Sequence, residues 1–346
     1  MAPEIDVTGE PERRRVPPRA RILGSLLGLA IGDALGMPVE GWTREKIERT
    51  HGWIDGYLPK LRDDGTVELP AGEFTDDTEV ALCHVEGLLG SGASVDPEAV
   101  GRRLIRLARG ESARLLDPTT RAAVAEMEET DRFQGGAALA GPPSGSVTTQ
   151  VVPVALAQSL GHFNPEMFCR EVARAALLTH GNLESLNGAL AIAYAIRLLV
   201  TDAVPPEVLI DEVAAFIEED RVARRLRVAA ALARHRDDRA RDRRNLAEIG
   251  TTCDVAECVP AALYAFVTHA DDFAEAVLAG INGGGDTDTI GALVGALAGA
   301  HLGASAIPTQ WVEGLEGRMY ILVAGPGLYR LALTRAGLVL QLRQPE

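Results

Sequence analysis

The stretch Gly24-Ser-Leu-Leu-Gly28-Leu-Ala-Ile-Gly32-Asp33-Ala-Leu-Gly36 decides the fold of this chain. Its glycines recur every four residues, so they fall on one face of a helix and form a stripe without side chains. Such a stripe lets a second helix approach closely, and we predict that this is its role. Asp33 lies within the same apolar segment, and we expect its carboxylate to be buried and bonded to neighbouring backbone.

Helices follow one another along the rest of the chain. Ala- and Leu-rich segments are separated by short breaks, whereas sustained apolar–polar alternation is nearly absent. At most, residues 65–69 form a short irregular strand. No change of composition divides the chain, so we predict one all-α domain, a compact orthogonal bundle of many helices over residues 21–346, after a flexible tail over residues 1–20. The clearest helical patterns cover Ile22–Leu35, Asp77–Leu89, Pro97–Leu107, Leu183–Val200, Pro206–Glu219, Arg221–Arg234, Val255–Thr268, Asp272–Leu278 and Thr289–Leu302.

The composition is that of an ordinary globular protein. Hydrophobic residues make up 47% and charged residues 24% of the 346 residues, which excludes a disordered or fibrous chain. The formal net charge of −15 argues against a nucleic-acid partner. The four cysteines are scattered, so we expect reduced thiols and a cytoplasmic location. No secretory signal is visible and no unbroken apolar run reaches the roughly 18 residues that cross a bilayer, so we expect no membrane association.

Two short acidic clusters, far apart in the sequence, carry the chemistry. Residues 72–78, GEFTDDT, lead into one predicted helix, and residues 283–289, GGGDTDT, lead into another. Carboxylates on a tight turn repel one another, and Mg²⁺, Mn²⁺ or Ca²⁺ relieve that repulsion because these ions prefer oxygen ligands. Either cluster alone is read more simply as a helix N-terminus, since Thr and Asp are common caps. Together they supply about six oxygen ligands, enough for two ions ~3.5–4 Å apart, as in two-metal hydrolases.

Three stretches together resemble the signature segments of the ADP-ribosylglycohydrolase family, which includes the dinitrogenase-reductase-activating glycohydrolases. They are GSLLGLAIGDALGMPVE (residues 24–40), GEFTDDTEVAL (72–82) and INGGGDTDTIGALVGALAGAHLG (281–303), in the order and approximate spacing of that family. The resemblance implies an all-α fold with a dinuclear metal cleft that holds two Mg²⁺ or Mn²⁺ ions. It also implies a hydrolase that acts on ADP-ribosylated molecules.

Carried over position by position, the resemblance gives roles to individual residues. Glu40, on a loop after the helix break at Pro38, matches the glutamate that reaches the second ion or its water. His180 matches a position near the diphosphate or the distal ribose, and it equally fits a buried histidine at a helix entry. The family's diphosphate loop, usually Ser-Gly-Asn-Gly-Ser followed by Met-Arg, is replaced here by PSGSVTTQ over residues 143–150. The metal ligands would be Thr75, Asp76, Asp77, Asp286, Asp288 and Thr289. The loop residues assigned to the ligand are Ser144, Gly145, Ser146 and Val147, the last three through backbone N–H groups.

The reaction implied by the resemblance is hydrolysis of a ribosyl N- or O-glycosidic bond through an oxocarbenium-like transition state. Divalent ions lower the pKa of a water molecule, so a carboxylate suffices as the base. We expect Glu40 or Asp286 to be this base, and Asp288 to bridge the ions. Two alternatives stay open: a catalytically altered family member that binds ADP-ribose or has a structural role, and hydrolysis of a different ribosyl or phosphoryl bond. The residues do not choose among arginine, serine, nucleobase and small-molecule linkages.

Overall fold

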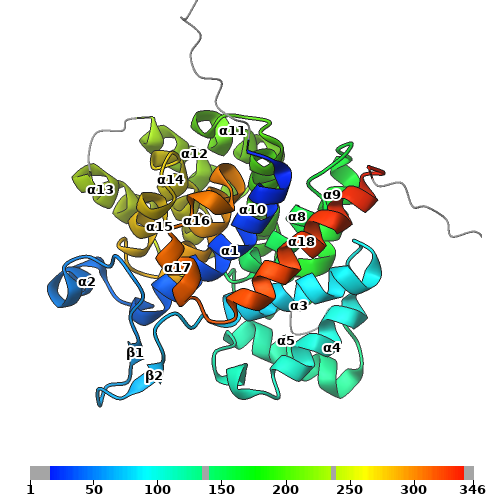
Figure 1. The fold of residues 1–346 in the computed structure, drawn as a ribbon, viewed down its shortest axis with the longest axis horizontal. Coiled ribbons are helices and arrows are strands. Elements are labelled where there is room, and N and C mark those ends of the chain that lie inside the picture. The colour runs from blue at the N-terminus through cyan, green and yellow to red at the C-terminus, as the bar shows by residue number, and fades with distance from the viewer. Residues whose placement is uncertain (1–15, 135–139, 235–238, 339–346) are drawn as a thin grey trace, which may run out of the picture.

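A computed structural model describes residues 16–134, 140–234 and 239–338, and these form an almost entirely helical body, as predicted (Figure 1). Two short strands pair as an antiparallel hairpin that projects from the bundle beside α2. The elements in chain order are α1 (Pro18–Gly36), η1 (Met37–Val39), α2 (Arg44–His51), β1 (Lys60–Leu61), β2 (Val67–Leu69), α3 (Asp76–Ser91), α4 (Pro97–Leu107), η2 (Glu111–Arg114), α5 (Pro118–Thr130), α7 (Val147–Gln150), α8 (Val152–Ala157), α9 (Pro165–Ala176), α10 (Leu183–Thr201), α11 (Pro206–Phe216), α12 (Arg221–Ala233), α13 (Arg239–Ile249), α14 (Val255–Thr268), α15 (Phe273–Ile281), α16 (Thr287–Leu302), η3 (Ala304–Ala306), α17 (Thr309–Gly314) and α18 (Arg318–Arg335).

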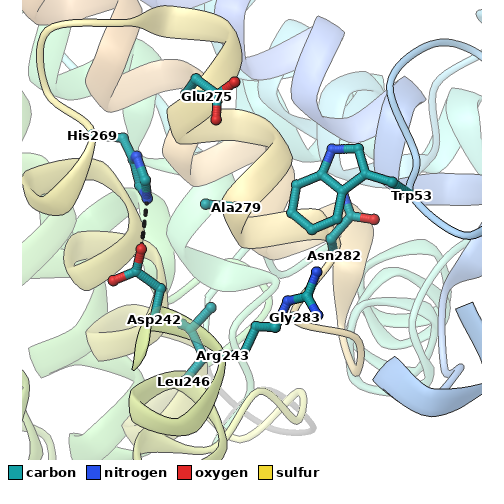
Figure 2. Close-up of a pocket in the computed structure, with 9 residues that line it drawn as sticks. All are labelled: Trp53, Asp242, Arg243, Leu246, His269, Glu275, Ala279, Asn282 and Gly283. Carbon is teal, nitrogen blue, oxygen red and sulfur yellow. Dashed lines mark hydrogen bonds and ion pairs between the residues drawn. The ribbon is translucent and has the colours of Figure 1, made fainter. Parts of the chain in front are cut away.

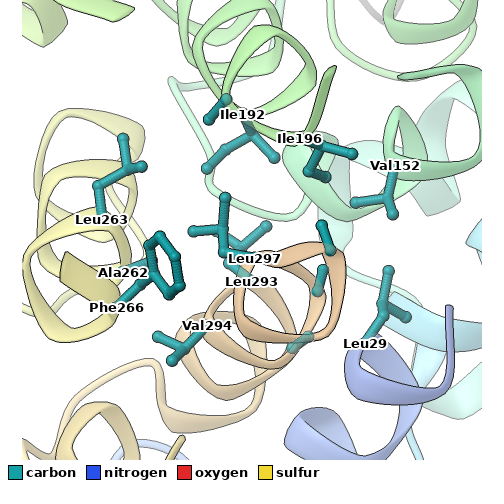
Figure 3. Packing of buried hydrophobic residues seen from close by; sticks show 14 of the residues in the cluster. Leu29, Val152, Ile192, Ile196, Ala262, Leu263, Phe266, Leu293, Val294 and Leu297 are labelled. Carbon is teal, nitrogen blue, oxygen red and sulfur yellow. The ribbon is translucent and has the colours of Figure 1, made fainter. Parts of the chain in front are cut away.

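The centre of the bundle is α16. Every residue from Thr287 to Ala300 is buried, which explains why this helix is apolar on all sides. Helices α1, α10 and α14 surround it, and Figure 3 shows side chains such as Leu29, Ile192 and Phe266 directed toward Leu293 and its neighbours. The core therefore lies around one helix whose N-terminus carries the second acidic cluster.

The glycine stripe of α1 lies directly against α16, as predicted. Gly28 faces Gly295 and Gly32 faces Gly291, so the two helices run antiparallel. At each of these four positions a Cβ would overlap the backbone carbonyl of the facing glycine. The two backbones are thus in van der Waals contact, which only glycine permits. This contact fixes the distance between the two helices.

Several element boundaries differ from those predicted. Helix α1 begins at Pro18, so residues 18–20 of the expected tail are helical, while residues 1–15 lie outside the described part of the chain. The helix expected to reach Glu219 ends at Phe216. The expected strand is present as β2, paired with β1. Helix α18 was not among the clear patterns because Gly325, Pro326 and Gly327 interrupt its periodicity, yet the helix continues through them.

Two helices, α1 and α10, are long and apolar enough to cross a membrane by length and composition. In the structure, 94% of the apolar window of α1 and 72% of that of α10 is buried inside the protein. Both are core helices of the bundle, and a buried core helix has the same length and apolar composition as a membrane-spanning helix.

A buried histidine predicts how stability changes with pH. His84 on α3 is fully buried with neither ring nitrogen hydrogen-bonded, and burial lowers its pKa to about 4, opposed only in part by Gln150. The folded state therefore prefers the neutral ring, and stability falls as pH drops from 6.5 toward 4 because only the unfolded chain takes up the proton. We expect His84→Leu to gain stability relative to wild type over this range, by about 3 kcal/mol at most. Urea unfolding of both proteins at pH 7.0 and 4.5 measures the difference, and parallel losses of stability would contradict the prediction.

Candidate functional site

The two acidic clusters meet in the folded chain. Thr289 Oγ1, at the start of α16, donates a hydrogen bond to Asp77 Oδ2, at the start of α3, over 2.8 Å. These residues are 212 positions apart in the sequence. The other oxygen of Asp77 accepts a hydrogen bond from Thr149 Oγ1 at 2.9 Å. The arrangement on which the predicted chemistry depends is therefore present.

Helix α1 holds the first acidic turn in place. The carboxylate of Asp33 accepts hydrogen bonds from the backbone N–H of Thr75 at 3.0 Å, the N–H of Thr78 at 3.1 Å and the Thr78 hydroxyl at 2.6 Å. The prediction that Asp33 is buried and bonded to backbone is confirmed, although that backbone belongs to another segment. At the end of α1, Thr287 Oγ1 donates to the Gly36 carbonyl at 2.8 Å. One rigid helix thus holds both acidic turns.

The second turn depends on glycine backbone geometry. Gly284 and Gly285 have φ angles of +75° and +85°, in the left-handed region that favours glycine. Gly285 exchanges hydrogen bonds of 2.8 Å with the segment after α1, donating to the Trp42 carbonyl and accepting from the Gly41 N–H. This pairing places Glu40 beside the turn that carries Asp286.

A cleft with a volume of about 640 Å³ opens over these turns. Eight of the predicted site residues line it: Glu40, Asp76, Asp77, Ser144, Ser146, Asp286, Asp288 and Thr289. The other predicted site residues do not line the cleft; they are Thr75, Gly145, Val147 and His180. Thr75 is buried and its hydroxyl accepts from the Asp77 N–H at 3.4 Å, so it caps α3, as the simpler interpretation of this cluster predicted. His180 is fully buried.

The loop predicted to hold a diphosphate ends at Ser146, because α7 begins at Val147. Val147 is fully buried at the start of α7 and does not line the cleft. The N–H of Gly145 donates to the Cys253 carbonyl at 2.8 Å. We expected Gly145, Ser146 and Val147 to present N–H groups to a phosphate. This expectation is corrected at Gly145, because that donor already has a backbone partner, and the Ser146 N–H donates to Ser144 Oγ at 3.4 Å. Ser144 and Ser146 remain on the cleft wall, with their hydroxyl oxygens 3.0 Å apart.

Asp117 is a cleft residue that the sequence analysis did not select. Its N–H donates to Asp76 Oδ2 at 3.0 Å, and its Oδ1 caps α5 and lies 3.7 Å from His180 Nε2. Burial raises the pKa of Asp117, but its interactions with His180 and Thr120 outweigh burial and lower the pKa to about 2. Oδ2 is buried without a partner. The Asp-Pro pair at 117–118 signals a helix start, which is why the sequence alone indicated no further role.

The carboxylates of the site raise one another's pKa. Burial is the first cause and neighbouring carboxylates the next for Asp77 and Asp286, whose pKa values lie well above the ordinary value. Burial and the charge of Glu40 raise the pKa of Asp288 to about 6. Among the described residues, the cleft lining contains no lysine or arginine. The folded chain therefore concentrates negative charge that its basic side chains neutralise only in part, through the Lys60–Glu40 and Arg221–Asp254 pairs.

The donor chemistry of this cleft fits hard divalent cations. Asp286 Oδ2 is buried with no hydrogen-bond partner, and after burial the charge of Asp288 is the next cause that raises the pKa of Asp286. Carboxylate and hydroxyl oxygens predominate among the donors of the lining, which also includes the Cys253 thiol, and oxygens are the ligands that Mg²⁺ and Mn²⁺ prefer. In the part of the chain that the structure describes, no three His, Cys, Asp or Glu side chains form a ready metal cage. The fit between this cleft and divalent cations therefore rests on the negative charge of the lining and on its oxygen donors.

A second, separate cavity lies on the other side of the glycine turn, between α13, α15 and the segment after α2. Figure 2 shows the Asp242–His269 pair, 3.1 Å apart, facing Trp53 across it. Its volume is about 20 Å³, room for about one water molecule. None of the predicted site residues lines it. We therefore place the candidate active site in the larger cleft.

Comparison with known proteins identifies the family of this chain. The family model of ADP-ribosylglycohydrolase matches residues 14–341. The chain belongs to the ADP-ribosylglycohydrolase family. An uncharacterised Escherichia coli protein, YegU, is 32% identical over 83% of this chain and 89% of its own length. The ADP-ribosyl-[dinitrogen reductase] glycohydrolase of Rhodospirillum rubrum is 29% identical over 86% of this chain and 90% of its own length.

A solved structure shares the architecture of this ADP-ribosylglycohydrolase family member. It is described as an ADP-ribosylglycohydrolase-related protein complex, with a TM-score of 0.73, 29% identity, and coverage of 91% of this chain and 99% of that one. The all-α fold and the family predicted from the sequence are thus confirmed. The family supports a hydrolase that cleaves ADP-ribose linkages.

Proposed function

We propose that this chain hydrolyses the ribosyl glycosidic bond of ADP-ribosylated protein side chains or small molecules and releases ADP-ribose. The contact between Thr289 and Asp77 carries the proposal, because it joins both acidic clusters at the floor of one cleft. Two Mg²⁺ or Mn²⁺ ions would be held there by the carboxylates and hydroxyls of these clusters. When bound, such ions supply positive charge that orients hydroxyl groups and lowers the pKa of water.

The chain's own residues have defined tasks in this reaction. Water attacks the anomeric carbon of the ribose, the bond to the aglycone breaks, and the aglycone leaves with the electron pair and takes up a proton. Glu40 and Asp286 both line the cleft and are the candidate bases for the water proton. Asp286 offers a buried oxygen without a partner. Ser144 and Ser146 would orient the remainder of the substrate along the wall.

The charge of the cleft favours a cationic aglycone. Its lining contains seven carboxylates and, within the described residues, no basic side chain, and two of the carboxylates, Asp117 and Asp254, lie outside the set that would hold the ions or act as the base. Asp254 at the rim already binds a guanidinium, that of Arg221, through two hydrogen bonds of 2.7 and 2.8 Å. Asp117 also lines this cleft, and its Oδ2 is buried with no hydrogen-bond partner. We therefore expect arginine-linked ADP-ribose to be preferred to serine-linked ADP-ribose.

The test is release of free ADP-ribose from peptides modified on arginine or on serine, followed by chromatography. With Mg²⁺ or Mn²⁺ we expect turnover, with EDTA none, and for arginine a kcat/KM larger by about tenfold or more. Asp271→Asn removes a carboxylate from the exposed surface instead of from the cleft, and this control variant should release ADP-ribose as fast as wild type. Calorimetric binding of ADP-ribose without turnover of either peptide or of ADP-ribosylated nucleic acid would instead support the binding or structural alternative.

A further inference from the structure

The ion pair between Lys60 and Glu40 stands at the edge of the cleft. Lys60 Nζ lies 2.7 Å from Glu40 Oε2, and the side chains are 24% and 44% exposed. Lys46 and Lys60 are the only lysines of the chain. Among the described residues, Lys60 is also the only Lys or Arg paired with Glu40, Asp76, Asp77, Asp286 or Asp288. It is therefore the cation nearest to the unbalanced charge of the cleft.

The two partners are held differently by the fold. The backbone next to Glu40 is fixed, since Gly41 donates to the Gly285 carbonyl at 2.8 Å. Lys60 is on β1 of the projecting hairpin, where the pairing register is irregular between Lys60 and Leu61. Such an irregularity re-aims side chains at the edge of a hairpin. Glu40 therefore lines the cleft from a fixed backbone position while its carboxylate is paired with a lysine on the hairpin.

The charges of the cleft act on both residues. Burial lowers the pKa of Lys60, but the hydrogen bond and charge of Glu40, together with the charges of Asp288 and Glu68, outweigh burial and raise it. Glu40 in turn acts on Asp288, whose pKa it raises. Lys60, Glu40 and Asp288 therefore form one electrostatic unit. A cation added to the cleft floor competes with the Lys60 ammonium for Glu40.

We propose that Lys60 is a positioning residue for Glu40, a latch that holds this carboxylate at the cleft edge and releases it when divalent cations enter. The latch rests on the proposed metal-dependent function. Lys60 relieves repulsion among the carboxylates when no divalent ion is bound, and it opposes the entry of one. Removal of its charge should therefore tighten divalent binding, whereas an ion pair that serves stability alone would leave that binding unchanged.

Calorimetric titration of the metal-stripped protein with Mn²⁺ tests the latch. Because the Lys60 ammonium competes with the divalent ion for the Glu40 carboxylate, we expect Lys60→Met to lower the Kd about three- to tenfold. Lys60→Arg keeps the charge and should stay within about twofold of wild type. In a Glu40→Gln background, Lys60→Met should change the Kd less than about twofold, since the carboxylate that couples the two sites is gone. An unchanged or larger Kd in Lys60→Met would overturn the latch.

Lysine-selective NMR gives a second readout that does not depend on activity. With ¹³Cε-labelled lysine the protein shows two side-chain signals, and Lys46→Arg assigns them. Lys46 lies over the Trp42 ring, 3.7 Å from its centroid, and serves as the internal reference. Addition of Mg²⁺ should move the Lys60 signal toward that of free lysine and leave Lys46 in place. A wild-type protein that binds no divalent ion would overturn the proposed metal centre and the latch together, whereas normal binding with an unmoved Lys60 signal would overturn the latch alone.

Discussion

Asp288→Asn is expected to reduce ADP-ribose release by at least about 1000-fold while making the metal-free protein more stable. Asp288 lines the cleft with Asp286, and if these carboxylates hold the proposed cations, a neutral amide at position 288 would not replace the charged ligand. Burial and the charge of Glu40 raise its pKa to about 6, so the folded state favours the protonated acid. Stability from this group is present below its unfolded pKa near 4 and is lost as pH rises through 6. At pH 8 the charged carboxylate costs the metal-free fold about 1–3 kcal/mol, which the amide avoids.

Thermal unfolding with EDTA and with Mn²⁺, alongside the release assay, separates these effects. Wild type should gain stability on Mn²⁺ addition, whereas Asp288→Asn should start higher and gain little. The N–H of Thr289 donates to Asp288 Oδ1 at 2.9 Å, a bond that an asparagine oxygen can keep. The variant should therefore fold normally. Retained activity would refute the proposal that the Asp288 carboxylate is needed for the reaction. A lower melting temperature than wild type in EDTA would refute the prediction that its negative charge destabilises the metal-free fold.

The sequence predicted which residues and helices form the site better than it predicted which residues contact one another there. The glycine stripe indicated close packing, and its partner on α16 shows the same spacing at Gly291, Gly295 and Gly299. Two matched stripes of one period are a signal that predicts a helix pair, because each needs a partner without side chains. Asp33 was predicted to bond to nearby backbone, whereas its partners are 42 and 45 residues away. Periodicity determines which face a residue occupies, and only tertiary packing determines what faces it.

The residues that the sequence analysis missed are loop and cap residues without periodicity. In the sequence, Asp117 before Pro118 is typical of an ordinary helix cap. It does cap α5, since its Oδ1 accepts a hydrogen bond from the Thr119 N–H at 2.8 Å. Asp117 nevertheless lines the cleft, and its other oxygen is buried without a partner. Lys60 belongs to a short strand whose position beside Glu40 depends on a hairpin. A polar side chain that serves the fold with one atom and the site with another looks purely structural in sequence.

Gly32→Ala is expected to lower the free energy of unfolding by at least about 3 kcal/mol, a large effect for the addition of a single methyl group. A Cβ at Gly32 would overlap the Gly291 carbonyl and lie 2.8 Å from the Ala292 nitrogen. These are backbone atoms of a buried helix, so no side chain can rotate away and the helices must separate. The higher helix propensity of alanine recovers only about 1 kcal/mol. Urea unfolding followed by circular dichroism measures the loss.

Gly90→Ala on α3 is the matched control, because its Cβ would meet nothing closer than Arg103 Nη2 at 4.0 Å. That variant should be as stable as wild type or gain up to about 1 kcal/mol. Because Gly32 precedes Asp33, separation of the helices in Gly32→Ala also moves the carboxylate that holds Thr75 and Thr78. Any protein that still folds should therefore bind Mn²⁺ more weakly and release ADP-ribose more slowly. Wild-type stability in Gly32→Ala would mean that the two helices do not touch, and then nothing in the core would bring the two acidic turns together.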